Sequence, residues 1–277
     1  KSAAAVERGP RSAPVAVEAP RVGKTPAPIA APVAAADSIT LASGAPPVGT
    51  VWEEESSEVG ELTMSMGRGT PPLTNRKIEQ RKVEVLAVEG DAITRARITY
   101  VRMSQELMMG GERQGGPSPI EGQTYTLERG TPTIVWNDAA PATAAEVAAV
   151  RKAEPHFGEP EPVAKMLAGR TFKRGETIEL PADQVLVAMS SGPGDGLSRA
   201  RMSMTFVGMD GVHARFVATL STAGERDGGP FEAEATGEVV VDPRTSDAID
   251  VELSGSLKMR GKVSSDGTMT MTVHRKQ

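Results

Sequence analysis

The chain has 277 residues, of which 39% are hydrophobic but only 3% aromatic, and it carries no cysteine and a net charge of −5. This composition excludes disulfides and cysteine-based chemistry, and the acidic balance argues against general nucleic-acid binding, which needs a basic surface. The length suffices for one large or two ordinary domains whose core relies on aliphatic residues and thirteen methionines.

Residues 1–47 are rich in Ala, Pro and Val and show neither helical nor strand periodicity. Because repeated proline removes backbone donors and favours extended structure, this segment is predicted to be a disordered tether. The chain begins at Lys1 rather than at Met, which suggests that a signal peptide was removed. We expect a membrane anchor upstream of Lys1, as on a bacterial lipoprotein, with an ordinary disordered leader as the alternative.

Residues 48–140 are predicted to form a first β-unit. Apolar and polar side chains alternate from Val83 to Ile98 around a turn at residues 89–91. Ala96 lies on the same side of its strand as Ile98, and arginines occupy the other side. One buried face and one solvated face are typical of antiparallel hairpins.

Residues 141–169 change periodicity and predict a helical connector. Thr143 and Glu146 fit a capping box at the start of a first helix. Pro162 suits the first turn of a second short helix, and Gly169 suits its end.

Residues 170–277 are predicted to form a second β-unit with a clearer period of two. Its inward faces are predicted over residues 200–206, from Val212 to Leu220, and over residues 231–239, 249–253 and 267–273. Only residues 184–189 are ambiguous between helix and strand.

A short Gly-rich sequence occurs twice, as GERQGGP at residues 111–117 and as GERDGGP at residues 224–230. Similar strand–turn–strand patterns precede both copies, and residues 48–52 resemble residues 174–178. We interpret the chain as mainly β, with two repeated curved antiparallel β-meander units arranged as half-barrels or as a sandwich. The helices are expected to cover an open edge or mouth.

Three methionine pairs each place two thioethers on one face of a strand: Met64 and Met66, Met202 and Met204, and Met269 and Met271. Thioethers suit Cu(I), but His274 points to the opposite face from its neighbouring pair. The alternating partners are apolar, so the pairs are interpreted as core and no metal site is assigned.

A Met-rich inner face also adapts to varied apolar shapes and suits the wall of a lipid or peptide cavity, with a packed core as the alternative. The Met-Met pair before the first Gly-rich loop is a candidate flexible lid, or simply an exposed hairpin tip. The candidate ligand-binding residues are Met108, Met109, Met202, Met204, Phe206 and Phe216.

The remaining motifs favour structural interpretations. Successive glycines can form anion-binding nests, but no helix start follows them as a phosphate loop requires, and hairpin turns explain them. The acidic residues Asp242, Asp247, Asp250 and Glu252 match no calcium loop and are interpreted as a polar hairpin with Arg244 as local countercharge.

The three histidines, His156, His213 and His274, are scattered, and known hydrolase motifs are absent from the sequence. No catalytic residue and no cofactor are therefore assigned, and the chain is expected not to be an enzyme.

A duplicated β-meander behind an Ala/Pro-rich leader resembles uncharacterised bacterial envelope lipoproteins and is loosely similar to the half-barrel lipid and lipoprotein carriers of the periplasm. The resemblance covers the organisation from about Gly49 to the C-terminus and contains no diagnostic motif, so it transfers no functional residue. It implies a cell-envelope location, in the periplasm or at the surface.

The sequence thus favours a non-enzymatic envelope protein, tethered at its N-terminus, that binds a lipid-like apolar ligand or an envelope protein partner. A structural or assembly lipoprotein with a filled core is the second hypothesis, and a hydrolase using His213 is the third.

Overall fold

The structure, a computed structural model, describes residues 37–64, 72–137, 140–189, 196–226, 229–260 and 264–277. The first strands are β1 (Ser38–Thr40), β2 (Val51–Met64), β3 (Leu73–Glu89), β4 (Ala92–Met109), β5 (Glu112–Pro117), β6 (Thr124–Glu128) and β7 (Ile134–Asn137). The helices are α1 (Ala144–Ala153), α2 (Pro162–Leu167) and α3 (Ala182–Met189). The later strands are β8 (Thr171–Lys173), β9 (Thr177–Glu179), β10 (Leu197–Asp210), β11 (His213–Arg226), β12 (Gly229–Val241), β13 (Ala248–Met259) and β14 (Ser265–Lys276).

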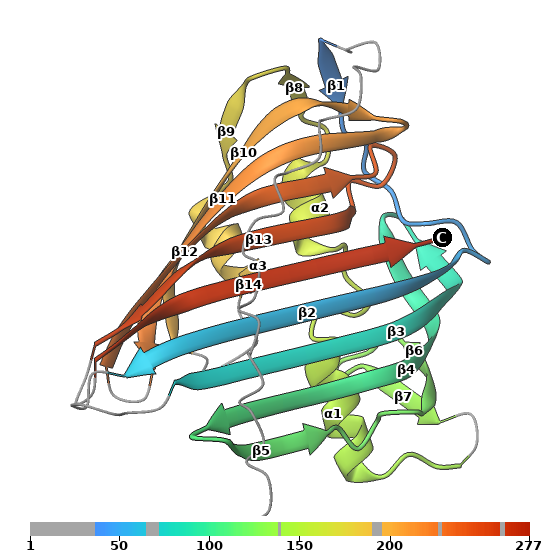
Figure 1. Cartoon of the computed structure of the whole chain (residues 1–277). Coiled ribbons are helices and arrows are strands. Elements are labelled where there is room, and N and C mark those ends of the chain that lie inside the picture. Colours follow the sequence, from blue (N-terminus) through green and yellow to red (C-terminus); the bar gives the residue numbers. More distant parts are fainter. Residues whose placement is uncertain (1–36, 65–71, 138–139, 190–195, 227–228, 261–263) are drawn as a thin grey trace, which may run out of the picture. The chain divides into compact units, whose positions relative to one another are not determined.

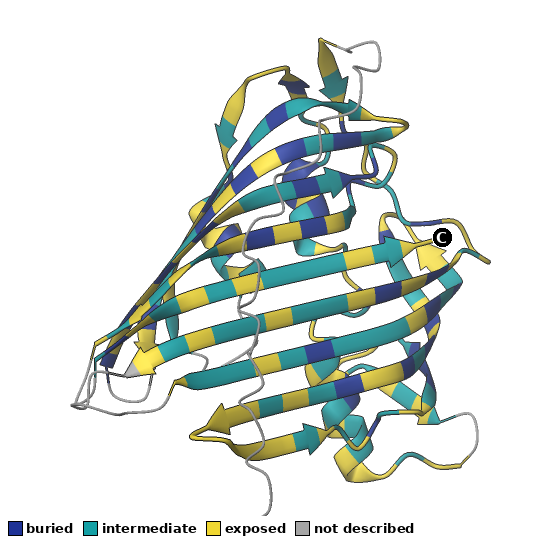
Figure 2. Ribbon diagram, viewed as in Figure 1, coloured by how far each residue is buried: buried dark blue, intermediate teal, exposed yellow. Residues whose placement is uncertain are grey.

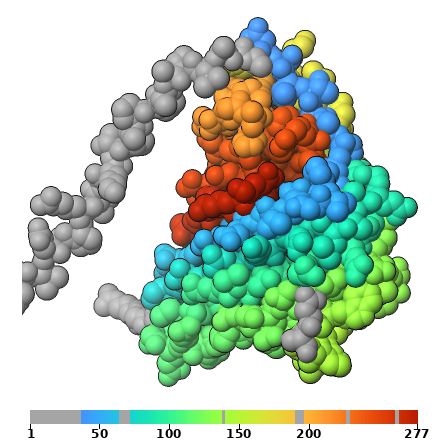
Figure 3. All heavy atoms as spheres, turned by 90° about the vertical axis from the view of Figure 1, so that its right-hand side faces the viewer, coloured from blue at the N-terminus to red at the C-terminus, as the bar shows by residue number. Residues whose placement is uncertain are grey.

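Twelve of these strands form one antiparallel sheet in the order β7-β6-β4-β3-β2-β14-β13-β12-β11-β10-β9, with β5 paired to β4 (Figure 1). Most neighbours in the sheet are neighbours in sequence, which confirms the predicted meanders. The two predicted β-units are not two sheets packed face to face, because the last strand, β14, pairs with β2 along its whole length. Figure 3 shows the C-terminal strand lying beside β2 at this seam.

The three helices pack on one face of the sheet, which we call the covered face, rather than over an edge. The strands bury alternate residues on this face, as the banding in Figure 2 shows. Thr143 accepts from the backbone N–H of Glu146, whose carboxylate accepts from the N–H of Thr143, so the predicted capping box of α1 is confirmed. In the described part of the chain, none of the helices is long and apolar enough to cross a membrane.

Two separate cores lie on the covered face. The first core joins β2, β3, β4 and β6 to α1 and contains Trp52, Val83, Val85, Ala96, Ile98, Tyr100, Met103, Ile120, Tyr125, Leu127 and Val150. The second core joins β10–β13 to α2, α3 and β8, and Phe172, Phe206 and Phe216 lie at its centre. The ambiguous segment 184–189 belongs to α3, because Val185 is buried against the second core.

The structured part of the chain begins earlier than predicted. Residues 1–36 lie outside the described residues, but the end of the predicted tether packs against the folded protein. β1 pairs with β8, and Leu41 is fully buried in the second core. The backbone of Leu41 also exchanges hydrogen bonds with Gly169 and Arg170. Apolar burial therefore outweighs the proline-rich composition here.

The two Gly-rich copies occupy different positions in their hairpins. In the first, Gly111 belongs to the turn between β4 and β5 and has a φ of 86°. In the second, Gly224 lies inside β11 and pairs with Phe231 of β12. The duplication therefore stays a prediction. Val212 also differs from its predicted inward position, because it lies in the turn after β10 and is 70% exposed.

Three glycines on the covered face lie where the backbones of neighbouring strands approach closely. Gly237, Gly255 and Gly267 lie on successive strands, each displaced by two residues from the last. A Cβ at any of them would lie within 2 Å of a carbonyl oxygen of the adjacent strand. Glycine in a strand interior permits such close backbone approach and bending.

Replacing Gly255 by Ala is expected to lower the free energy of unfolding by about 1–3 kcal/mol, because the added Cβ would meet the carbonyl oxygen of Glu234 at 1.7 Å. Urea denaturation measures the change. Ser256→Ala, on the exposed face of the same strand, is the matched control and should change stability by less than about 0.5 kcal/mol. Equal stability of the two variants would refute the close approach.

Candidate functional site

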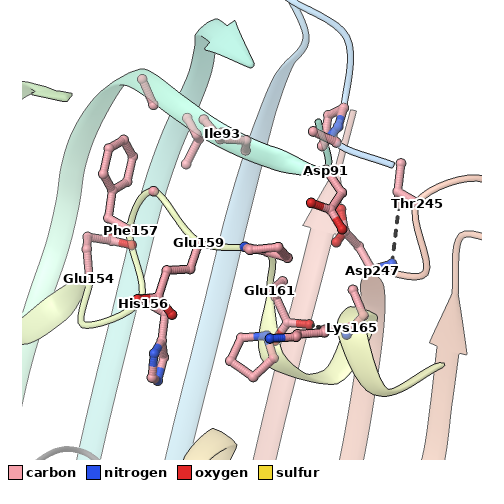
Figure 4. A pocket seen from close by; sticks show the side chains of 18 of the residues that line it. Asp91, Ile93, Glu154, His156, Phe157, Glu159, Glu161, Lys165, Thr245 and Asp247 are labelled. Atoms are coloured by element: carbon pink, nitrogen blue, oxygen red, sulfur yellow. Dashed lines mark hydrogen bonds between the residues drawn. The ribbon is translucent and has the colours of Figure 1, made fainter. Parts of the chain in front are cut away.

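A cavity of about 280 Å³ lies on the covered face, close to the seam between the two halves. We call it the central cavity. Its walls come from the N-terminal segment 43–46, from β2–β4, from residues 153–165, and from Thr245, Asp247 and Arg275 (Figure 4). Segments from both halves of the sequence therefore meet there.

Local structure explains why these stretches converge. Residues 154–161 connect α1 to α2 and contain two prolines and Gly158, whose φ is 88°, so they cross the cavity as irregular chain. The N-terminal segment is fixed opposite them, since Ser43 donates to Asp91 at 3.0 Å and the backbone N–H of Gly49 donates to Val85 at 2.8 Å.

A network of five buried or half-buried charges underlies the cavity. We call Glu54, Arg81, Glu154, Asp247 and Arg275 the central ion cluster. Glu54 is the register partner of Arg81 on β3 and of Arg275 on β14. Its Oε1 accepts from Arg81 Nε and Nη2 at 3.0 and 2.6 Å, and its Oε2 accepts from Arg275 Nε and Nη2 at 3.2 and 3.0 Å.

Each arginine also binds a second carboxylate. Arg81 donates through Nη1 to Glu154, which also accepts from the hydroxyl of Tyr100 at 3.3 Å. Arg275 donates through Nη1 to Asp247 at 3.4 Å, and its guanidinium carbon lies 4.9 Å from the ring centre of Trp52. Three carboxylates thus share two guanidinium groups.

The three carboxylates outnumber the two guanidinium groups, and their pKa values differ. Burial alone would raise the pKa of Glu54, but the guanidinium groups of Arg81 and Arg275 outweigh it and lower this pKa to about 2. Burial raises the pKa of Glu154 and also that of Asp247, against the opposing attraction of their arginines. Glu54 is therefore the firmly ionised centre of the cluster, and the outer carboxylates hold protons more readily.

Two side chains that line the cavity have a ring nitrogen without a hydrogen-bond partner. Trp52 is only 6% exposed, and its Nε1 has no acceptor among the described residues. The Nε2 atom of His156, on the connecting loop, is likewise unpartnered. Both nitrogen atoms are buried within the wall rather than open to the cavity, and such unpartnered buried polar groups are rare and costly.

The candidate ligand-binding residues predicted from the sequence do not line the central cavity. The structure brings Met202, Met204, Phe206 and Phe216 together, but inside the second core, where α2, α3 and Phe172 cover them. Met108 and Met109 end β4 at a distant hairpin tip and are 44% and 45% exposed. Of the three predicted methionine pairs, Met66 lies outside the described residues.

The acidic residues of the β12–β13 hairpin also separate. Asp242 accepts from Arg244 Nη2 at 2.7 Å, which confirms the predicted local countercharge. Asp247 instead turns toward the cavity, and Asp250 lies on the opposite face with His274, whose Nδ1 is 2.9 Å from it. Among the described residues, no group of three His, Asp or Glu side chains could hold a metal ion.

Most residues of the central ion cluster could not be identified from the sequence. By alternation Glu54 lies on the same face as Trp52, but Glu53 and Glu55 flank it, so the sequence shows only a run of charges typical of a solvated strand.

No protein-family model matches the chain, and no curated protein matches it at a significant level.

Proposed function

We propose that this chain is a non-enzymatic binding protein of the cell envelope that holds a small ligand, or a single inserted group of a partner, in the central cavity. The envelope location and an N-terminal tether rest on the Ala/Pro-rich composition of residues 1–36 and on the resemblance to envelope lipoproteins. The binding role rests on the cavity.

The observation that carries the proposal is the central cavity itself, which segments from both halves of the sequence line on the covered face. Ligand sites are typically concave and mostly apolar, with a few convergent polar groups. The central cavity has this make-up, since the buried side chains of Val83 and Ile98 form an apolar wall beside the half-buried charges of Arg81 and Glu154.

The size of the cavity selects among the ligands expected from the sequence. Sites for drug-sized molecules usually measure about 300–1,000 Å³, and the central cavity, at about 280 Å³, lies just below that range. This favours a compact molecule, or one side chain of a partner protein, over a whole lipid. The Met-rich face proposed for an acyl chain is filled by side chains of the second core.

A structural role without a ligand is the second candidate. It is favoured by the mutual pairing within the central ion cluster, in which Glu54 already receives four donors. In that case the cluster would serve only to join β14 to β2.

Native mass spectrometry of the full chain, purified from the envelope fraction of its host, is expected to show a bound small molecule. Replacing Ala153 by Phe should abolish this adduct, because Ala153 ends α1, is half-buried and lines the cavity. The larger ring would occupy the space.

Lys152→Phe adds the same ring on an exposed position of α1 that does not line the cavity, and it should retain the adduct. A ligand-free wild type would favour the structural role. An adduct that survives Ala153→Phe, with the fold intact by circular dichroism, would place the ligand elsewhere.

A further inference from the structure

The segment between β1 and β2 forms one wall of the central cavity. Residues 41–50 belong to no helix or strand and run from the end of β1 to the start of β2 (Figure 1). We call them the N-terminal strap. Its residues 43–46 line the cavity, and among these Pro46 is buried whereas Ser43 is exposed. The strap therefore places a buried proline in the cavity wall while most of its length faces solvent.

One end of the strap is fastened beside the second core. Leu41 is fully buried there, and its backbone exchanges hydrogen bonds with residues 169–170. The backbone N–H of Ala42 donates to the carbonyl of Pro243 at 2.8 Å, and the hydroxyl of Ser246 donates to the carbonyl of Ala42 at 2.5 Å. This end is held by one buried side chain and by backbone hydrogen bonds.

The other end is fastened beside the first core. The backbone N–H of Gly49 donates to the carbonyl of Val85 at 2.8 Å, and the N–H of Val85 donates to the carbonyl of Thr50 at 3.0 Å. Between the two ends, Ser43 donates to Asp91 at 3.0 Å, and both of these side chains are exposed. The strap thus bridges the two cores, and its middle has few buried contacts. Segments of this kind open locally at a low free energy.

We propose that the N-terminal strap is a gate of the central cavity, which opens when Leu41 leaves the second core and Ser43 leaves Asp91. The strap would then swing about Gly49, whose φ of 86° suits a glycine hinge and whose end stays paired to β3. This movement withdraws Pro46 from the cavity wall. The inference rests on the proposed binding function, because a gate has a use only where the cavity takes up a ligand.

Acrylamide quenching of tryptophan fluorescence tests the gate in the full chain without any ligand. Trp52 lines the cavity and is 6% exposed, and Trp136→Phe leaves it as the single tryptophan reporter. In this background, Leu41→Ala is expected to raise the quenching constant at least about twofold, because loss of the buried side chain favours local opening of the strap. Circular dichroism should stay unchanged. If Leu41→Ala fails to fold, Ser246→Ala replaces it, because it removes a hydroxyl that holds the strap, and the same direction of change is expected.

Val48→Ala is the matched control. Val48 belongs to the strap but is 59% exposed, so the quenching constant should stay at the wild-type value. A disulfide between Ser43→Cys and Asp91→Cys locks the strap in a chain that has no cysteine of its own. It should return the quenching of Leu41→Ala to the wild-type value, and reduction should restore the increase. A general loosening of the second core would not respond to this cross-link.

Unchanged quenching in Leu41→Ala, or an increase that the disulfide does not reverse, overturns the gate. The proposed function is judged separately, by the host-derived adduct and its loss in Ala153→Phe. A strap that opens in a protein without an adduct would support the gate and reject the binding function. An adduct in a protein whose strap does not open would do the reverse.

Discussion

Replacing Glu54 by Gln is expected to lower the free energy of unfolding at pH 7 by about 3 kcal/mol. Glu54 has a side chain only 9% exposed, and it is the shared partner of Arg81 and Arg275. Removing one member of a buried ion pair is strongly destabilising, because the remaining charges are left uncompensated. The difference between the ordinary pKa of 4.5 and about 2 in the folded protein corresponds to a similar energy.

Urea denaturation at pH 7 measures this change. Glu55→Gln is the matched control, because Glu55 is the next residue of β2 and is exposed on the other face, so its loss should stay within about 0.5 kcal/mol. Similar losses for the two variants would contradict the assigned role of Glu54.

The difference in stability between the wild type and Glu54→Gln is expected to depend on pH. The folded-state pKa of Glu54 lies below its unfolded value, so its contribution to stability is complete above about pH 4.5 and is lost as the pH falls toward about 2. The difference in stability between wild type and Glu54→Gln should therefore shrink over this window. A difference that stays constant down to pH 2 would mean that the charge of Glu54 is not what stabilises the seam.

Replacing Phe216 by Ala is expected to cost about 3–5 kcal/mol, the usual range for removing a fully buried phenylalanine. Phe216 of β11 is 0% exposed. Its ring centre lies 5.0 Å from that of Phe172 on β8 and 5.5 Å from that of Phe206 on β10. The substitution therefore removes the contact that joins the sheet to the chain leaving α2.

The measurement is again the urea midpoint, with an unchanged slope required for a simple change in stability. Val217→Ala is the control, because Val217 follows on the same strand and is 41% exposed on the other face. A loss below about 1 kcal/mol for Phe216→Ala would show that this face is loosely packed, which would reopen the Met-rich ligand surface predicted from the sequence.

Local sequence patterns were sufficient to predict most of the individual strands and helices. Alternation of apolar and polar residues placed Ala96, Ile98 and Tyr100 on the buried side of β4, because the side-chain period of a strand is two wherever the strand lies. The capping box at Thr143 and the end of α2 at Gly169 were equally readable, since helix ends depend on a few adjacent residues.

Predictions from composition and alternation were wrong where tertiary contacts or turn geometry decide the structure. Residues 37–47 look like the end of a disordered leader, yet burial of Leu41 and pairing of β1 with β8 order them. Val212 continues the alternation of β11 but lies in the preceding turn, with Gly211 at a φ of 59°, so it is exposed. Turn geometry, rather than periodicity, decides the ends of strands.

The amino-acid sequence by itself determined that the chain is mainly β, built of antiparallel meanders with a helical connector, because these features depend on contacts between nearby residues. Only the tertiary structure decided that β14 pairs with β2, which brings Arg275 against Glu54 across 221 positions of sequence. A strand's periodicity shows which face is buried but not which strand lies next to it. That pairing completes the central ion cluster, which also needs Arg81 of β3 and Glu154 at the end of α1, so the candidate site could not be read from the sequence.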